Sequence, residues 1–329
     1  MEEASQKQFA LVDAITYEFK GLDSLSLGDL GVHPAGNIPT TTRKAEKVMA
    51  RFFKQDDSVF VRGSGTAAIR EALASVMKAG ETLLVHSAPI YSTTITSIDH
   101  LGIKTVSCDF NDLVSLKKTV SENKAIKAVL IQYTRQQLSD SYDMKEVIET
   151  IKSVKDIPIV TDDNYAVMKV DKIGVELGAD LSCFSCFKLL GPEGVGLVVG
   201  KGNYIDTIHS FHYSGGSQTQ GHEAMEALRG MVFGPITHAI QAVEGEKVLK
   251  AINENKIDGI DKAIIVNAQS KVILVRFEKP VAQEVLAAAE KFGAAPYPIG
   301  AESKYEMVPM FYRVSGTMLK DDPEFALHW

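Results

Sequence analysis

Short apolar runs rich in β-branched residues alternate with longer stretches of helix formers through the middle of the chain. One such stretch of helix formers is TAAIREALASVMKAG, which follows the first apolar run. This alternation is typical of a mostly parallel sheet covered by helices on both faces. The pattern predicts an α/β fold with seven strands, beginning at Val59, Thr82, Lys104, Ala128, Ile157, Leu181 and Gly196.

The two ends of the chain show other patterns. Residues 1–57 combine a helical start, the Gly/Pro-rich stretch LGVHPAGNIPTTT and the amphipathic KAEKVMARFF, and we predict an N-terminal arm. A long helical pattern closes the large domain, which spans residues 58–254. VILVRFE, VAQEVLAAAEKFG and MVPMFYRVSG then indicate strand, helix and strand. Residues 255–329 are therefore predicted to form a small C-terminal α+β domain.

Charge and cysteine content narrow the partners. Thirty-five basic and 42 acidic residues give a net charge of -7, so no overall positive field attracts nucleic acid or anionic lipid. The start MEEASQKQ lacks the apolar core of a signal peptide, and no apolar run approaches the roughly 18 residues that cross a bilayer. Cys183 and Cys186 lack the second pair that a metal site would need. We expect a cytoplasmic protein that binds small molecules, with no membrane, nucleic-acid or metal partner.

A glycine-rich turn, GSGT at residues 63–66, joins the first predicted strand directly to a helix. Glycine lets the backbone approach a ligand, and the free N–H groups of a helix start favour an anion, most often phosphate. An ordinary tight turn is one alternative. A dinucleotide site is another, because the glycine spacing fits that fingerprint. The next strand ends in His86 rather than an acidic residue, which disfavours nicotinamide binding.

Two further candidate sites follow later strands. Asp162 and Asp163 end the strand IPIVT, at the edge of an open α/β sheet where ligands lie, although turn or helix-cap aspartates are the alternative. Lys188 follows the strand LSCFS within the apolar segment CFKLLG. Apolar surroundings remove the hydration of an ammonium group and make the amine a usable nucleophile. A surface lysine whose stem covers apolar side chains is the alternative.

The order of these three sites resembles the fold type I, or aspartate-aminotransferase-type, enzymes that use pyridoxal 5'-phosphate. GSGTAA resembles Ser-Ser-Gly-Met-Ala-Ala of the cystathionine lyase group, and TDDNYA at residues 161–166 resembles its Val-Asp-Asn-Thr-Phe-Ala. FSCFKLLGPEGVGLVVG is similar to the lysine segment of the selenocysteine-synthase-like group. The resemblance covers about residues 55–200 well and the remainder loosely.

The resemblance implies a role for each matching residue. Lys188 would form the Schiff base with the cofactor aldehyde and move the Cα proton. Asp162 would pair with the pyridinium N–H, and Tyr91 would stack on the ring, unless it is a core tyrosine. Arg313 would grip the substrate carboxylate, with a surface strand arginine as the alternative. The phosphate ligands would be the backbone N–H groups of Gly65 and Thr66 and the hydroxyls of Ser64 and Ser185.

One phosphate ligand of the cystathionine group is missing. That group has Tyr-Ser-Arg before Gly-Asn-Pro-Thr, donated to the neighbouring subunit, whereas this chain has His-Pro-Ala before the GNIPT at residues 36–40. Arg43, or the loop around Ser217 and Thr219, is a candidate replacement.

The resemblance implies an enzyme that acts on an amino acid. Because the closest local motifs belong to lyase-like groups, we expect a lyase or elimination reaction at Cα/Cβ. An aminotransferase is the alternative, and a catalytically silent binding or regulatory protein with the same fold is the second alternative. The resemblance also implies a homodimer whose active sites are completed across the subunit interface.

Overall fold

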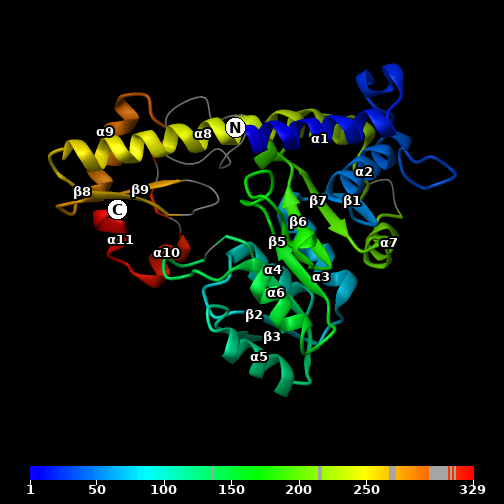
Figure 1. Cartoon of the computed structure of the whole chain (residues 1–329), viewed down its shortest axis with the longest axis horizontal. Helices are drawn as coiled ribbons and strands as arrows, with labels where there is room; N and C mark the ends of the chain where they lie inside the picture. Colours follow the sequence, from blue (N-terminus) through cyan, green and yellow to red (C-terminus); the bar gives the residue numbers. More distant parts are fainter. Residues whose placement is uncertain (135, 214–216, 267–271, 296–309, 312, 315) are drawn as a thin grey trace.

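A seven-stranded sheet forms the centre of the molecule (Figure 1). The computed structural model describes residues 1–134, 136–213, 217–266, 272–295, 310–311, 313–314 and 316–329. The strands of the sheet are β1 (Asp57–Arg62), β2 (Thr82–His86), β3 (Lys104–Cys108), β4 (Ile126–Gln132), β5 (Ile159–Asp162), β6 (Leu181–Ser185) and β7 (Val195–Gly200). Their order is β1-β7-β6-β5-β4-β2-β3, and only β7 is antiparallel to its neighbours. The predicted mostly parallel seven-stranded sheet is therefore confirmed.

Different helices cover the two faces of the sheet. Alternate residues of β1 point to opposite faces, as the pleat requires: Val59 and Val61 join one buried cluster and Phe60 another. The predicted cover on both faces is thus confirmed. The first cluster lies under α3 (Ser64–Val76), α4 (Ser92–His100) and α7 (Gly202–Phe211). The opposite face packs against α2 (Thr40–Phe53), α5 (Leu113–Glu122), α6 (Met144–Lys152) and α8 (Gly221–Asn255).

The N-terminal residues form part of this cover. α1 (Glu2–Glu18) packs against α2 and α8, and its Leu11 and Ala14 are buried in the same cluster as Phe60 (Figure 1). The 3₁₀ helix η1 (Gly21–Leu25) follows α1. The predicted helical start and the amphipathic segment are therefore packed helices that complete one face of the sheet.

The long helix α8 leads from the sheet to the C-terminal region (Figure 1). Its 35 residues bury Ala224, Leu228 and Met231 near the N-terminal end, whereas the second half is mostly exposed. No helix in the part of the chain that the structure describes combines the length and apolar composition needed to span a bilayer.

The C-terminal region contains a second, smaller sheet. β8 (Ile260–Ile265) and β9 (Ile273–Phe277) pair antiparallel, and β9 matches the predicted VILVRFE strand. β8 is an addition that the sequence pattern did not predict, because IDKAII interrupts its apolar positions with two charges. The predicted strand around Met310 lies largely outside the described residues, apart from a bridge between Met310 and Ala295. The helices of this region are α9 (Ala282–Lys291), α10 (Gly316–Asp321) and α11 (Phe325–His328).

Candidate active site

The parallel topology brings the predicted site residues to one edge of the sheet. The carboxyl ends of β1, β2, β5 and β6 lie at this edge because the four strands run in the same direction. The 63–66 turn follows β1, Asp162 ends β5 and Ser185 ends β6. Lys188 lies just beyond β6, in the 3₁₀ helix η3 (Phe187–Leu189). Open α/β sheets bind ligands at this edge.

Lys188 is enclosed by aromatic side chains. It is 9% exposed, and its Nζ lies 3.7 Å from the centroid of the Tyr165 ring and 5.2 Å from that of Phe187. These distances allow attraction between the ammonium group and the ring faces. His238 of α8 donates from Nε2 to the Lys188 carbonyl oxygen over 3.0 Å, and burial lowers the pKa of His238 to about 4. Lys188 is therefore held on both its backbone and its amine end.

Asp162 is half-buried, is affected by the charge of this lysine and is oriented by Asn164. Its Oδ1 accepts hydrogen bonds from the backbone N–H of Asn164 at 3.1 Å and from the Asn164 amide at 2.7 Å. Asn164 Oδ1 in turn accepts from the Ser185 N–H at 2.8 Å. Burial raises the pKa of Asp162, while the bonds from Asn164 and the charge of Lys188 oppose the rise. Asn164 thus links the aspartate to the end of β6.

Asp163 has different partners. Its carboxylate accepts from the Thr161 hydroxyl at 2.6 Å and from the Gly174 N–H at 3.4 Å, and its own backbone N–H donates to the Cys183 oxygen. Burial raises its pKa to about 7. These bonds tie Asp163 to the packing between β5 and β6. Of the two carboxylates, Asp162 is therefore the one on which the charge of Lys188 acts, and its pairing with a ring nitrogen stays a prediction.

The turn after β1 leads directly into the first turn of α3. Gly63 has φ 106°, and the N–H groups of Gly63 and Ser64 donate to the Gly194 oxygen at 2.8 and 3.1 Å. The N–H groups of Gly65 and Thr66 belong to the first turn of α3, where no intrahelical acceptor exists. They are free to point at an anion bound before the helix.

Two buried hydroxyls next to this turn are unsatisfied. The Oγ atoms of Ser64 and Ser185 have no hydrogen-bond partner among the residues that the structure describes. An unsatisfied buried hydroxyl is costly and uncommon. Both atoms belong to the set implied as phosphate ligands, so the residues present fit the phosphate of pyridoxal 5'-phosphate.

Gly65 is required by close packing rather than by its backbone angles. A Cβ atom built on it would lie 2.3 Å from Asn164 Oδ1, the atom that accepts from Ser185 N–H. Any larger residue would displace Asn164 and with it the contacts of Asp162. The turn, the aspartate and the end of β6 therefore form one packed unit.

Tyr91 and Thr66 connect this unit to α4. The Thr66 hydroxyl bonds to the Thr93 hydroxyl at 3.3 Å, and Tyr91 is the residue that precedes α4. The Tyr91 side chain is 52% exposed. The segment that carries Tyr91 thus adjoins the 63–66 turn, and Tyr91 is not a core tyrosine.

The remaining candidate ligand residues are Arg313, Arg43, Ser217 and Thr219. Arg313 is exposed, and no hydrogen bond or ion pair joins it to the described part of the chain, so its role stays a prediction. Arg43 binds Asp57 at 2.9 Å and Glu46 at 3.1 Å within its own chain. Thr219 keeps a buried hydroxyl without a partner in the described structure, while Ser217 is exposed.

Sequence reasoning missed two features of this edge. Asn164 lies inside the TDDNYA motif and was available from the sequence, but its amide matters only because Asp162, Gly65 and Ser185 converge on it. His86 and Asp140 form a buried pair 54 positions apart, and no motif connects them.

Two family models together match nearly the whole chain, and so do a relative and a solved structure. Residues 3–233 match the model of the Cys/Met metabolism PLP-dependent enzyme family, and residues 246–328 match the model of the YhfS-like C-terminal domain. Protein YhfS of Escherichia coli strain K12 is 50% identical over 322 residues, which cover 98% of this chain and 89% of that protein. The crystal structure of the pyridoxal-5'-phosphate-dependent protein YhfS from Escherichia coli gives a TM-score of 0.96 at 50% identity and covers 99% of this chain and 90% of that one.

More distant structures share the fold. The carbon-sulfur lyase involved in aluminum resistance from Clostridium novyi NT gives a TM-score of 0.72 at 17% identity, covering 90% of this chain and 76% of that one. The cystathione gamma lyase CalE6 from Micromonospora echinospora gives 0.67 at 14%, covering 80% and 72%. With its larger part matched by the family model, the chain belongs to the Cys/Met metabolism family of pyridoxal-phosphate-dependent enzymes, as the resemblance of its motifs to fold type I and the cystathionine lyase group predicts.

Proposed function

We propose that the chain is a lyase that cleaves a bond at Cα or Cβ of an amino acid. The observation that carries the proposal is the position of the Lys188 amine. It lies at the carboxyl edge of the sheet, against the Tyr165 ring and in the electrostatic range of the half-buried Asp162. A lysine in this setting can hold a carbonyl group and exchange protons with a neighbouring carbon.

The chemistry divides between the cofactor and the chain. Bound pyridoxal phosphate supplies an aldehyde that captures amines and a ring that accepts the electron pair left at Cα. Lys188 would hold the aldehyde and, in its neutral form, take and return the Cα proton. Asp162 would keep a proton on the ring nitrogen. Ser64, Ser185 and the first-turn amides of α3 would hold the phosphate and fix the ring over the substrate.

The names of related proteins favour elimination over transfer of the amino group. The structural neighbours include a carbon-sulfur lyase and a cystathione gamma lyase, and the family belongs to cysteine and methionine metabolism. We infer a substrate with a sulfur substituent on its side chain. For a Cβ substituent, elimination followed by hydrolysis would convert the amino acid and one water into a thiol, a keto acid and ammonium.

A product assay tests the proposal. Purified protein loaded with pyridoxal phosphate is incubated with a panel of amino acids, and thiol, ammonia and keto acid are measured without any added keto-acid acceptor. A lyase releases all three, and Lys188→Ala provides the matched inactive control. Activity that requires an added keto acid and releases no ammonia would identify an aminotransferase. An intact cofactor spectrum without turnover across the panel would favour the silent binding protein.

We also propose that the chain acts as a homodimer. The segment of residues 21–32 extends away from the sheet beyond α1 and α2 (Figure 1) and exposes four leucines. A run of exposed apolar side chains of this size is typical of an interface. Sedimentation of wild type and of the double variant with Leu25→Ser and Leu27→Ser tests this, because a dimer held by this segment would shift toward monomer. The four leucines are Leu22, Leu25, Leu27 and Leu30, exposed by 80%, 72%, 80% and 74%.

A further inference from the structure

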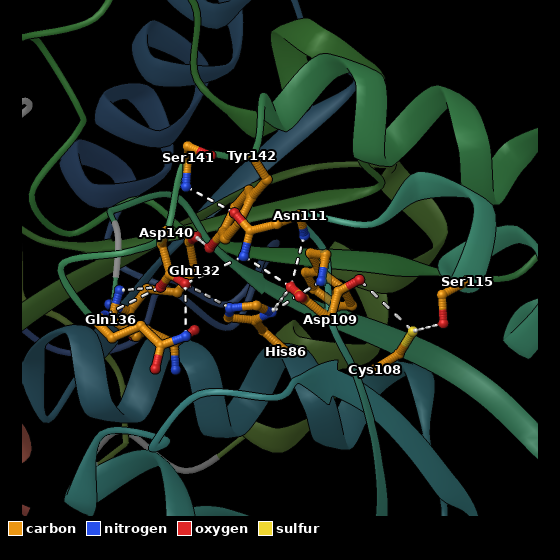
Figure 2. A network of polar contacts seen from close by, with 12 residues as sticks. His86, Cys108, Asp109, Asn111, Ser115, Gln132, Gln136, Asp140, Ser141 and Tyr142 are labelled. Atoms are coloured by element: carbon orange, nitrogen blue, oxygen red, sulfur yellow. Dashed lines mark hydrogen bonds and ion pairs between the residues drawn. The ribbon is translucent and has the colours of Figure 1, made fainter. Parts of the chain in front are cut away.

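A second buried polar network lies at the carboxyl edge of the sheet (Figure 2). It joins His86 at the end of β2 to Asp140, which lies in the segment of residues 136–143 before α6. The side chains of His86 and Asp140 are each 1% exposed. Neither residue has a part in the chemistry assigned to Lys188 and Asp162.

The hydrogen bonds settle the state of the histidine. The Phe110 N–H donates to His86 Nδ1 at 3.0 Å, so this nitrogen carries no proton. His86 Nε2 therefore carries the proton and donates to Asp140 Oδ1 at 2.9 Å (Figure 2). His86 is thus anchored to the backbone after β3 and presents one fixed N–H to the carboxylate.

Asp140 gathers the backbone of its own segment. Its Oδ2 accepts from the N–H groups of Gln136 at 2.8 Å and Gln137 at 3.1 Å. Burial alone would raise the pKa of Asp140, but the bonds from His86 and the two amides lower it to about 2. The carboxylate is charged at neutral pH and holds the start of the 136–143 segment in one conformation.

The segment is tied in turn to the ends of two strands. The Gln136 amide donates to the Pro89 oxygen at 3.0 Å, and Pro89 lies two residues before Tyr91. The Tyr142 hydroxyl donates to the Gln132 oxygen at the end of β4, at 2.5 Å (Figure 2). The network therefore fixes the approach to Tyr91 as well as its own segment.

A small cavity connects the network to the predicted cofactor site. His86, Gln132 and Gln136 share its wall with Asp162, the residue implied to pair with the ring nitrogen. The rest of the lining is Val85, Ile90, Thr94 and Leu130. A shift of Gln136 or His86 would therefore change the space next to Asp162.

We propose that Asp140 and His86 are positioning residues for the cofactor: together they hold Gln136 and the Pro89–Tyr91 segment as the wall of the pocket beside Asp162. The inference rests on the cofactor site described above. Sites of this kind depend on supporting residues that lock the groups in contact with the ligand, because displacements of about 0.5 Å already weaken binding. Neither Asp140 nor His86 needs to touch the cofactor.

Cofactor titration of Asp140→Asn tests the proposal. Asparagine keeps the size of the side chain but turns an N–H toward at least one of the present donors. We expect the dissociation constant for pyridoxal phosphate to rise by about tenfold or more, with a changed circular dichroism of the bound cofactor. The matched control is Asp180→Asn at the opposite edge of the sheet, where Asp180 binds Lys152 and the Ile159 N–H. This control should lower the melting temperature and leave the dissociation constant unchanged.

Two histidine variants give an internal rescue test. Gln at position 86 can still donate to Asp140 from the place of Nε2, so His86→Gln should keep the dissociation constant within about threefold of wild type. His86→Leu removes the donor and should match Asp140→Asn. If neither disruptive variant folds, Gln136→Ala decides, since it removes the bond to Pro89 and part of the cavity wall but leaves the bond between His86 and Asp140 in place.

Two results would contradict the positioning role of Asp140 and His86. Wild-type affinity and dichroism in every disruptive variant that folds, Gln136→Ala included, would show that the network serves stability alone. Equal losses of affinity in Asp180→Asn would show the same. Since the titration reads binding and not turnover, a wild-type protein that binds the cofactor but lacks lyase activity contradicts the proposed function and leaves this test intact.

Discussion

Each edge of the main sheet contains a buried aspartate whose charge is balanced by hydrogen bonds or ion pairs, but the two edges differ in their other polar groups. At the amino edge, the buried Asp180 is bound by Lys152 at 2.6 Å, Lys201 at 2.5 Å and the Ile159 N–H at 2.8 Å. At the carboxyl edge, Asp140 is satisfied just as fully. The carboxyl edge, however, also holds the hydroxyls of Ser64 and Ser185, which have no partner in the part of the chain that the structure describes. Polar groups that only stabilise a fold are satisfied within it, whereas a binding edge keeps some for its ligand.

The largest expected effect is the loss of activity on replacing Lys188 at the carboxyl edge, compared with replacing Lys152 at the amino edge. Lys188→Ala should lower turnover by more than about a thousandfold and remove the visible absorption of lysine-bound cofactor, because it removes the amine proposed to hold the aldehyde and move the Cα proton. Lys152→Ala, at the amino edge, should lower the free energy of unfolding by about 1–2 kcal/mol and leave the spectrum intact. Absorption spectra, product assays and thermal melts of both variants check this. Retained cofactor absorption in Lys188→Ala would contradict the assignment.

The pH dependence of stability distinguishes Asp163 from Asp140. Burial raises the pKa of Asp163 to about 7, so the folded chain keeps a proton there that the unfolded chain releases above about pH 4. The unfolded state then binds fewer protons, and this residue's contribution to stability falls as pH rises from about 4 to 7, by up to about 1 kcal/mol per unit. Asp163→Asn should flatten that slope in denaturant titrations. An unchanged slope would show that Asp163 is charged in the fold.

The pKa of Asp140 moves in the opposite direction. Because bonds to the charged form lower it to about 2, its contribution to stability is present above about pH 4 and is lost as pH falls toward 2. The two residues therefore place opposite slopes in adjoining pH ranges, which lets one set of titrations measure both.

The smallest effect tests the unsatisfied hydroxyls directly. Ser185→Ala removes a buried hydroxyl that has no partner in the described structure, so the cofactor-free chain should be as stable as wild type or up to about 1 kcal/mol more stable. Pyridoxal phosphate should bind about tenfold more weakly, because a phosphate ligand is lost. Melting curves and cofactor titration measure the two quantities.

A second serine of the same strand is the control. The Ser182 hydroxyl accepts from the Val175 N–H and bonds to Thr161, both at 2.9 Å. Ser182→Ala should therefore lower stability by about 1 kcal/mol with no change in cofactor affinity. If Ser185→Ala behaves like Ser182→Ala, the comparison between satisfied and unsatisfied groups fails.

Much of the sheet was predictable because its signals are local. Each strand is an apolar run of a few residues, and parallel strands buried on both faces read as nearly continuous apolar segments. Lys188 and Asp162 could also be proposed as site residues from the sequence, since each follows such a run within a short motif. β8 was not, because Asp261 and Lys262 break the pattern of a strand that is only partly buried. The apolar pattern along the chain therefore reveals strands that are buried along their whole length, and it misses a partly buried strand such as β8.

The amino-acid sequence by itself determined most of the strand and helix pattern and the cofactor family, and it suggested Lys188 as the candidate reactive lysine. Only the tertiary structure decided which polar groups meet: that Asn164 fills the space left by Gly65, that the charge of Lys188 acts on Asp162, and that His86 reaches Asp140. The physical reason is that secondary structure follows from neighbours along the chain, whereas hydrogen-bond satisfaction and burial depend on atoms brought together across the sheet. The ligand-binding edge is defined by those long-range contacts.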